Sequence, residues 1–237
     1  MISIPYLICS ILSFVPAIVL HEAAHGFAAW RLGDPTAKRA GRLSMNPLKH
    51  VDPFGTVIMP LLLMAANMPV FGYAKPVPYN PAYFKDPRKG DLIVGLAGPA
   101  ANLALAALGA VAHALAAWAL PVHLLAQNDL LFYFLTLFLP LFSLINLYLA
   151  FFNLLPIPPL DGSRIVGAFP PLDGSSVFAF FLPRKHLPKY YRVQRYAFPI
   201  FMVAVILVPY VLHVNPVGIY LDATAGTVFD LLFSFGG

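Results

Sequence analysis

Long apolar runs constrain this chain more than any other feature of its sequence. A helix needs about 20 apolar residues to cross a hydrocarbon core of about 30 Å. Segments long and apolar enough for crossing helices lie at 3–30, 91–119, 130–154 and 196–214, and a final apolar segment lies near 216–235. Because 59% of the residues are hydrophobic and only 11% are charged, we predict an all-α polytopic membrane protein.

A further apolar segment, 54–73, either crosses the membrane or enters it and returns on the same side. Gly55, Pro60, Pro69 and Gly72 interrupt it, and irregular backbone at membrane depth is tolerated only where it packs in protein or lines a cavity. A re-entrant path puts all 15 Lys and Arg on one face, whereas a crossing splits them five against ten. The positive-inside rule favours re-entry and cytoplasmic basic loops. We therefore predict about five transmembrane helices, within a range of four to six, plus a re-entrant or β-hairpin-like element.

The remaining charged residues follow this membrane topology. The basic run at 183–195 lies between two apolar segments, so we interpret it as a contact with anionic lipid, and we expect no nucleic-acid partner. Asp222 and Asp230 lie in the last apolar segment, and the sequence leaves open whether that segment crosses. Cys9 is the only cysteine, which excludes an internal disulfide.

The first apolar segment contains the motif HEAAH at 21–25, which includes Glu22, the only glutamate of the chain. His21 and His25 are four residues apart, so a helix places both imidazoles on one face, where they can bind one metal ion. Glu22 is adjacent and can act as the general base for the attacking water, as in zinc hydrolases with an HExxH helix. The alternative is a polar pin between helices, for which one or two polar residues would suffice.

A catalytic zinc site needs a third protein ligand, and Asp161 is the best candidate. It ends the segment FFNLLPIPPLDG, in which Pro156, Pro158 and Pro159 end the preceding helix. The extended tail can then fold Asp161 back toward the first helix, with Gly162 allowing the turn.

Asp173 is the alternative third ligand. The sequence PPLDGS occurs at 158–163 and again at 170–175, so both aspartates have nearly the same local context. Only the first copy directly follows a helix long enough to span the membrane.

HEAAH at 21–25, GLAGPAAN at 95–102 and NLLPIPPLDG at 153–162 resemble, in order and spacing, the motifs of the site-2 protease family of intramembrane zinc metalloproteases. The resemblance covers about residues 10–165. In that family an asparagine precedes the metal-binding aspartate by eight residues. Asn153 has this spacing to Asp161, whereas Ile165 occupies the position that would correspond for Asp173.

The resemblance implies one Zn²⁺ per chain, held by His21, His25 and Asp161, with Glu22 as general base. It also implies a re-entrant or sheet-like element after the first helix, for which residues 41–80 are available. We expect a single membrane-embedded metalloprotease domain over 1–237, with a catalytic core at about 1–165 and C-terminal helices at about 196–235. Neither the PDZ-like module nor the appended regulatory domain of larger members is expected.

Asn102 and Asn153 are weaker candidates for contacts with the substrate backbone or the developing oxyanion. For each of them, a role in tying helices together is nearly as plausible.

The predicted function is regulated intramembrane proteolysis of transmembrane protein or peptide substrates, in a multi-pass protein of a prokaryotic cell membrane. Contact with the lipid bilayer follows from that location, while the oligomeric state does not follow from the sequence. The alternatives are a membrane metal carrier and a scaffold that binds helices without cutting them. Glu22 argues against the scaffold, because binding alone needs no general base.

Overall fold

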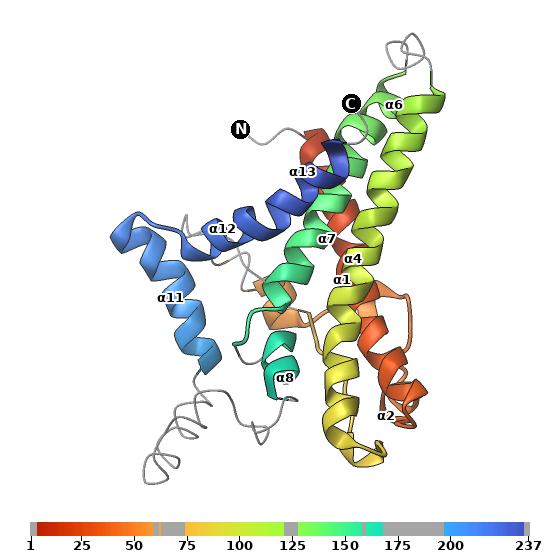
Figure 1. The fold of residues 1–237 in the computed structure, drawn as a ribbon, viewed down its shortest axis with the longest axis vertical. Helices are drawn as coiled ribbons and strands as arrows, with labels where there is room; N and C mark the ends of the chain where they lie inside the picture. Colours follow the sequence, from red (N-terminus) through yellow and green to blue (C-terminus); the bar gives the residue numbers. More distant parts are fainter. Residues whose placement is uncertain are drawn as a thin grey trace.

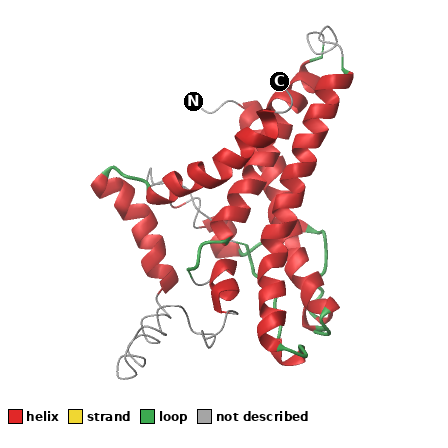
Figure 2. Ribbon diagram, in the orientation of Figure 1, coloured by secondary structure: helices red, strands yellow, loops and turns green. Residues whose placement is uncertain are grey.

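The fold is built from helices of very different length. The computed structural model describes residues 4–58, 62, 74–120, 128–157, 160–167 and 197–234. The longer helices are α1 (Ile4–Arg31), α4 (Pro87–Ala119), α7 (Leu139–Asn153) and α11 (Ala197–Leu212). The shorter ones are α2 (Thr36–Arg39), α6 (Asp129–Tyr133), α8 (Asp161–Gly167), α12 (Pro216–Leu221) and α13 (Thr227–Ser234). The 3₁₀ and π turns are η1 (Pro47–Lys49), η2 (Pro53–Ile58), η3 (Pro81–Tyr83), η4 (Phe134–Phe138) and η6 (Asp222–Gly226). None of the described residues forms a β-strand, and the all-α fold class is confirmed (Figure 2).

Within the described ranges, four helical stretches are long and apolar enough to cross a membrane. They are Ile4–Arg31, Pro87–Ala119, Asp129–Asn153, in which α6, η4 and α7 are continuous, and Pro216–Ser234. At 16 residues, α11 is shorter than a full span. The count of four lies within the predicted range. Most of the predicted re-entrant segment at 54–73 lies outside the described residues.

The start of α4 differs from the prediction. We expected a helix from residue 91, but α4 begins at Pro87, and Asp86 caps it by accepting hydrogen bonds from the N–H groups of Arg88 and Lys89 at 3.1 and 3.2 Å. Proline suits the first helical position, because its missing N–H would have no partner there. The apolar run thus placed the helix start four residues late, while the Asp-Pro capping signal marks it correctly.

Three long helices, α1, α4 and α7, lie side by side along the long axis of the molecule (Figure 1), and each contacts the other two. The short α8 packs against α4. The C-terminal helices pack on this bundle through Ala225, which is fully buried with Ala106 of α4 and Leu147 of α7. The three-helix bundle is the frame of the site described below.

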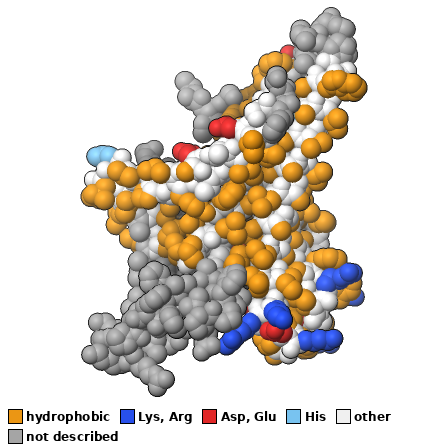
Figure 3. Space-filling view, viewed as in Figure 1, with side chains coloured by type: hydrophobic (Ala, Val, Ile, Leu, Met, Phe, Trp, Pro, Cys, Tyr) orange, Lys and Arg blue, Asp and Glu red, His pale blue; other side chains and the backbone are white. Residues whose placement is uncertain are grey.

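Apolar and basic side chains occupy different parts of the surface. Large apolar residues on the helices are exposed, for example Leu108 at 64% and Leu115 at 61%, as expected for a surface that faces lipid. The visible Lys and Arg side chains gather at the end of the molecule where α2 and the start of α4 lie (Figure 3). The expectation that all 15 basic residues share one face stays a prediction, because the side chains of Arg164 and of the basic run at 183–195 lie outside the described residues.

Candidate metal centre

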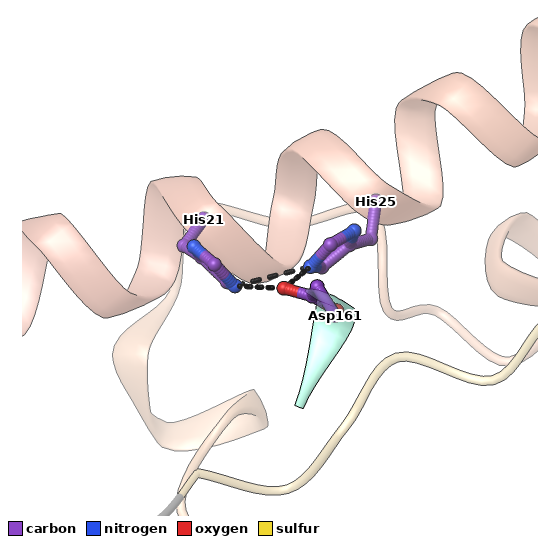
Figure 4. A group of neighbouring side chains, drawn as sticks. All are labelled: His21, His25 and Asp161. Atoms are coloured by element: carbon purple, nitrogen blue, oxygen red, sulfur yellow. Dashed lines mark hydrogen bonds and ion pairs between the residues drawn. The ribbon is translucent and has the colours of Figure 1, made fainter. Parts of the chain in front are cut away.

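His21 and His25 project from the same side of α1, one helical turn apart (Figure 4). Each residue is only 6% exposed. Their Nε2 atoms lie 3.0 Å apart, so the HEAAH spacing brings two potential ligand atoms to one point, as predicted.

Asp161 reaches the same point from the first position of α8. Its Oδ2 atom lies 3.1 Å from the Nε2 of His21 and 3.1 Å from that of His25, and Asp161 is also 6% exposed. Gly162 allows the chain to turn here, because a Cβ atom at that position would lie 2.2 Å from the carbonyl oxygen of Leu154. The predicted fold-back of Asp161 toward the first helix therefore matches the geometry.

Helix α4 orients both imidazoles through their Nδ1 atoms. The Nδ1 of His25 lies 2.6 Å from the carbonyl oxygen of Val94, and the Nδ1 of His21 lies 2.6 Å from Oδ1 of Asn102. Both partners are oxygens that only accept, so each Nδ1 carries the proton and donates it. Each neutral ring then presents an unprotonated Nε2 to the cluster, the arrangement by which outer partners orient metal-binding histidines.

Gly98 lies on the same face of α4, between Val94 and Asn102. A Cβ atom at Gly98 would lie 2.4 Å from Nε2 of His25 and 2.6 Å from Nε2 of His21. Glycine therefore lets α4 approach the imidazoles closely enough to bond both Nδ1 atoms. Within the GLAGPAAN motif, Asn102 is the residue that the sequence marks as a candidate, so this contact of Gly98 was not predicted.

The three converging atoms suit a divalent cation. Two neutral imidazole nitrogens and one carboxylate oxygen, 3.0–3.1 Å apart, repel one another unless a cation or a shared proton lies between them. In a tetrahedral zinc site with bonds of about 2.1 Å, ligand atoms lie about 3.4 Å apart, so a small outward movement admits the ion. Among the described residues, these three form the group of His, Cys, Asp and Glu side chains that can hold a metal.

The ionisation state of Asp161 also suits metal binding. Burial by itself raises the pKa of the Asp161 carboxyl, but without metal His21 and His25 can be protonated at Nε2 as well, and their hydrogen bonds and charge then outweigh burial and hold that pKa well below its usual value. Asp161 is thus a carboxylate in its present surroundings, which is the form that binds metal.

Glu22 lies beside the ligand cluster and faces another part of the chain. Its Oε2 atom accepts a hydrogen bond of 2.9 Å from the backbone N–H of Val77. Val77 belongs to residues 74–80, an extended segment that we call the strap. Successive helical residues are about 100° apart, so Glu22 borders the imidazole face of α1 without belonging to it.

Side chains and one backbone bond hold the strap in place. Its Lys75 N–H donates to the carbonyl of His50 at 2.9 Å, and its Asn80 N–H donates to Oδ2 of the fully buried Asp34 at 2.6 Å. Arg42 donates to the Lys75 carbonyl at 2.5 Å. The strap is extended but forms no strand, since Pro76 and Pro78 lack N–H groups for a β-ladder. The sheet-like element expected within residues 41–80 is therefore not formed by its described residues, and residues 59–61 and 63–73 lie outside them.

The remaining candidate residues differ in location. Asn102 is fully buried against His21. Asn153 is partly buried at the end of α7, where its side-chain amide donates to the carbonyl of Leu149 at 2.9 Å, and it is not in the three-residue metal group. Asp173 lies outside the described residues. Asn146 of α7, which sequence reasoning did not select, bonds to Asn102 at 2.8 Å.

Comparisons with known proteins agree with this site. Residues 112–208 match the model of peptidase family M50. The chain is 45% identical over 105 residues to "Putative zinc metalloprotease YwhC" of Bacillus subtilis, covering 44% of this chain and 43% of that protein. It is 38% identical over 98 residues to "Putative zinc metalloprotease Rip2" of Mycolicibacterium smegmatis, covering 41% and 37%. The matches thus span less than half of these relatives, and no solved structure matches. The family match and these relatives confirm that the chain resembles the site-2 proteases of peptidase family M50.

Proposed function

We propose that this chain is an intramembrane zinc metalloprotease that hydrolyses peptide bonds within transmembrane segments of other proteins. The observation that carries the proposal is the convergence of three ligand atoms, from His21, His25 and Asp161, inside a helix bundle with an apolar surface. The similarity to peptidase family M50 and to two relatives named as zinc metalloproteases supports it. One Zn²⁺ per chain would occupy this cluster, with a fourth position open to water or substrate.

Glu22 is the proposed general base. Zinc held at the cluster would polarise the substrate carbonyl and activate a water molecule. Glu22 would accept a proton from that water as the water oxygen attacks the carbonyl carbon, and would pass the proton to the amine nitrogen as the C–N bond breaks. The hydrogen bond from the Val77 N–H limits the rotation of the Glu22 side chain.

The two asparagines take different roles in this proposal. Asn102 uses its side chain to bond His21, Asn146 and the carbonyl of Ala17, so we assign it to positioning His21 in place of the substrate contact considered from the sequence. Asn153 is partly exposed and lies in the segment that leads to Asp161. It is our candidate for a contact with the substrate backbone.

The position of the site supports a substrate that lies in the membrane. His25 and His21 precede Arg31 by six and ten residues, about 9 and 15 Å along the helix. A substrate helix has its peptide groups already paired, so it must unwind locally before a carbonyl can reach the metal. We propose that the basic end of the molecule faces the cytoplasm and that water enters from that nearer side.

Replacement of Glu22 by Gln tests the function directly. The Glu22→Gln variant should retain zinc and lose cleavage of a model transmembrane peptide by a factor of about 10²–10⁴, the usual contribution of a general base. Persistent cleavage would remove Glu22 from the mechanism. If the unmodified protein, loaded with zinc, moved the ion across vesicle membranes without cutting any peptide, the metal-carrier alternative would replace the protease. Trapping membrane proteins on Glu22→Gln would then identify substrates.

A further inference from the structure

A chain of hydrogen bonds crosses the bundle from α7 to the candidate metal centre. The Nδ2 of Asn146 donates to the carbonyl oxygen of Phe142 at 2.8 Å. The Oδ1 of Asn146 accepts from Nδ2 of Asn102 at 2.8 Å, and Oδ1 of Asn102 accepts from Nδ1 of His21 at 2.6 Å. Three helices thus contribute to the orientation of one imidazole.

The backbone carbonyls of Phe142 and Ala17 decide which side-chain atom donates in each hydrogen bond of this series. A carbonyl oxygen only accepts, so the Phe142 carbonyl requires the nitrogen of the Asn146 amide on its side. The oxygen of Asn146 is then turned to Asn102. The carbonyl oxygen of Ala17 also requires a donor, and it accepts a hydrogen bond of 3.2 Å from Nδ2 of Asn102. The oxygen of Asn102 therefore faces His21, and the proton of His21 lies on Nδ1.

Burial makes this arrangement costly to change. Asn102 and Asn146 are both 0% exposed, and a rotation of either amide by 180° would put nitrogen against a donor and oxygen against a carbonyl. In the absence of water, such mispaired groups are strongly unfavourable. The two amides therefore favour a single orientation, and that orientation leaves Nε2 of His21 unprotonated toward His25 and Asp161.

We propose that Asn146 is a positioning residue of the metal centre, which acts through Asn102 to fix the tautomer and ring orientation of His21. Asn146 contacts none of the three ligands in the bonds described, and it lies outside the motifs that carry the family resemblance. The inference rests on the proposed zinc site, and it concerns metal binding and His21 rather than the cleavage step.

The test compares Asn146→Leu with Ser143→Ala in the full-length protein in detergent. Ser143 is a matched control because it is also fully buried on α7 and donates a hydrogen bond to α4, at the carbonyl of Ala106, 3.0 Å away. Its bond does not lead to His21. Dissociation constants for Co²⁺, measured by competition with a chelator, and the visible absorption of bound Co²⁺ report on the ligand geometry.

We expect Asn146→Leu to weaken Co²⁺ binding about tenfold, at the lower end of the effects seen for outer partners of metal ligands, and to alter the Co²⁺ absorption. Ser143→Ala should leave both unchanged, although it also removes a buried hydrogen bond. Asn146→Ala serves as the second variant if leucine prevents folding. Equal Co²⁺ affinity in the unmodified protein and a folded Asn146 variant would overturn the proposal, as would an equal loss in Ser143→Ala.

A second readout follows His21 itself. In zinc-loaded protein labelled with ¹⁵N-histidine, the N–H proton at Nδ1 of His21 should be visible and protected from exchange with water, and the Asn146 variants should shift its signal and speed its exchange. An unchanged His21 spectrum in those variants would contradict the positioning role. Because neither readout uses cleavage, this inference can fail while the protease proposal stands, and the reverse also holds.

Discussion

The two sides of α1 that border the site are held in different ways. On one side, His21 and His25 are buried, and α4 fixes each ring by a hydrogen bond to Nδ1. On the other side, Glu22 is partly exposed and receives a hydrogen bond from the Val77 N–H of the strap. Metal ligands need fixed geometry, whereas a general base must exchange protons with water and substrate. The difference fits the proposed roles, in which one turn of helix carries both functions while separate elements hold its two faces.

Removal of a ligand charge from the buried side should have the largest effect. Asp161→Asn replaces a carboxylate by a neutral amide, so the purified protein should lose most of its zinc, and cleavage should vanish with it. Asp173→Asn is the control, because PPLDGS gives Asp173 the same local sequence. Zinc content per chain, measured by mass spectrometry, decides between them, and equal retention in both variants would remove Asp161 from the site.

A methyl group added next to the imidazoles should have the next largest effect. In Gly98→Ala the new methyl group would meet Nε2 of His25 at 2.4 Å and force the imidazoles or α4 to move. We expect zinc affinity to fall about 10- to 100-fold. Gly109→Ala is a matched control on the same helix, since its methyl group would meet Oγ of Ser143 at 2.4 Å. It should lower stability without changing zinc affinity, and a similar affinity loss in both variants would show that the effect is not local to the ligands.

A substitution on the strap side of α1 should lower cleavage and leave metal binding unchanged. Val77→Pro removes the N–H that bonds Glu22, at a position that prolines already flank on both sides. We expect kcat to fall about tenfold, as for the loss of a hydrogen bond to a charged group, with unchanged zinc content. Val77→Ala keeps the N–H and should retain most activity. If both variants lost activity equally, the hydrogen bond would have no part in the effect.

The smallest effect is expected where the strap is anchored farther from Glu22. Asp34→Asn exchanges the oxygen that accepts from the Asn80 N–H for a donor, so the end of the strap should loosen. A loss of about 1 kcal/mol would lower the midpoint of thermal unfolding by about 2–4 °C, with zinc content unchanged. Asp86→Asn is the control, because asparagine also caps a helix. An unaltered midpoint in Asp34→Asn would show that this anchor contributes little.

Local sequence patterns could predict the parts of the site that lie within one helix or one turn. The four-residue spacing of His21 and His25 determines their common face, and the prolines before Asp161 indicate a chain that turns back. The choice of Asp161 over Asp173 rested on two grounds: only the first PPLDGS copy directly follows a helix long enough to span the membrane, and only Asp161 has the family's spacing of eight residues from an asparagine, Asn153.

Contacts between helices could not be predicted in the same way. Gly98 and Asn146 act through atoms of other helices, and which residues meet depends on how α1, α4 and α7 are rotated and shifted relative to one another. Many rotations bury comparable apolar surface, so hydrophobic pattern alone does not select one. The strap differs for a related reason: the family resemblance implied a sheet-like element in this region, whereas side chains of other elements, Glu22 and Asp34 among them, accept hydrogen bonds from the strap.

X-ray absorption at the zinc edge of the purified, zinc-loaded protein can decide whether His21, His25 and Asp161 bind one zinc ion. We expect one zinc per chain with four light ligands, nitrogen at about 2.0–2.1 Å and oxygen at about 2.0–2.2 Å, including an imidazole signal from two histidines. A folded protein that binds no zinc, or a spectrum without imidazole scattering, would contradict it.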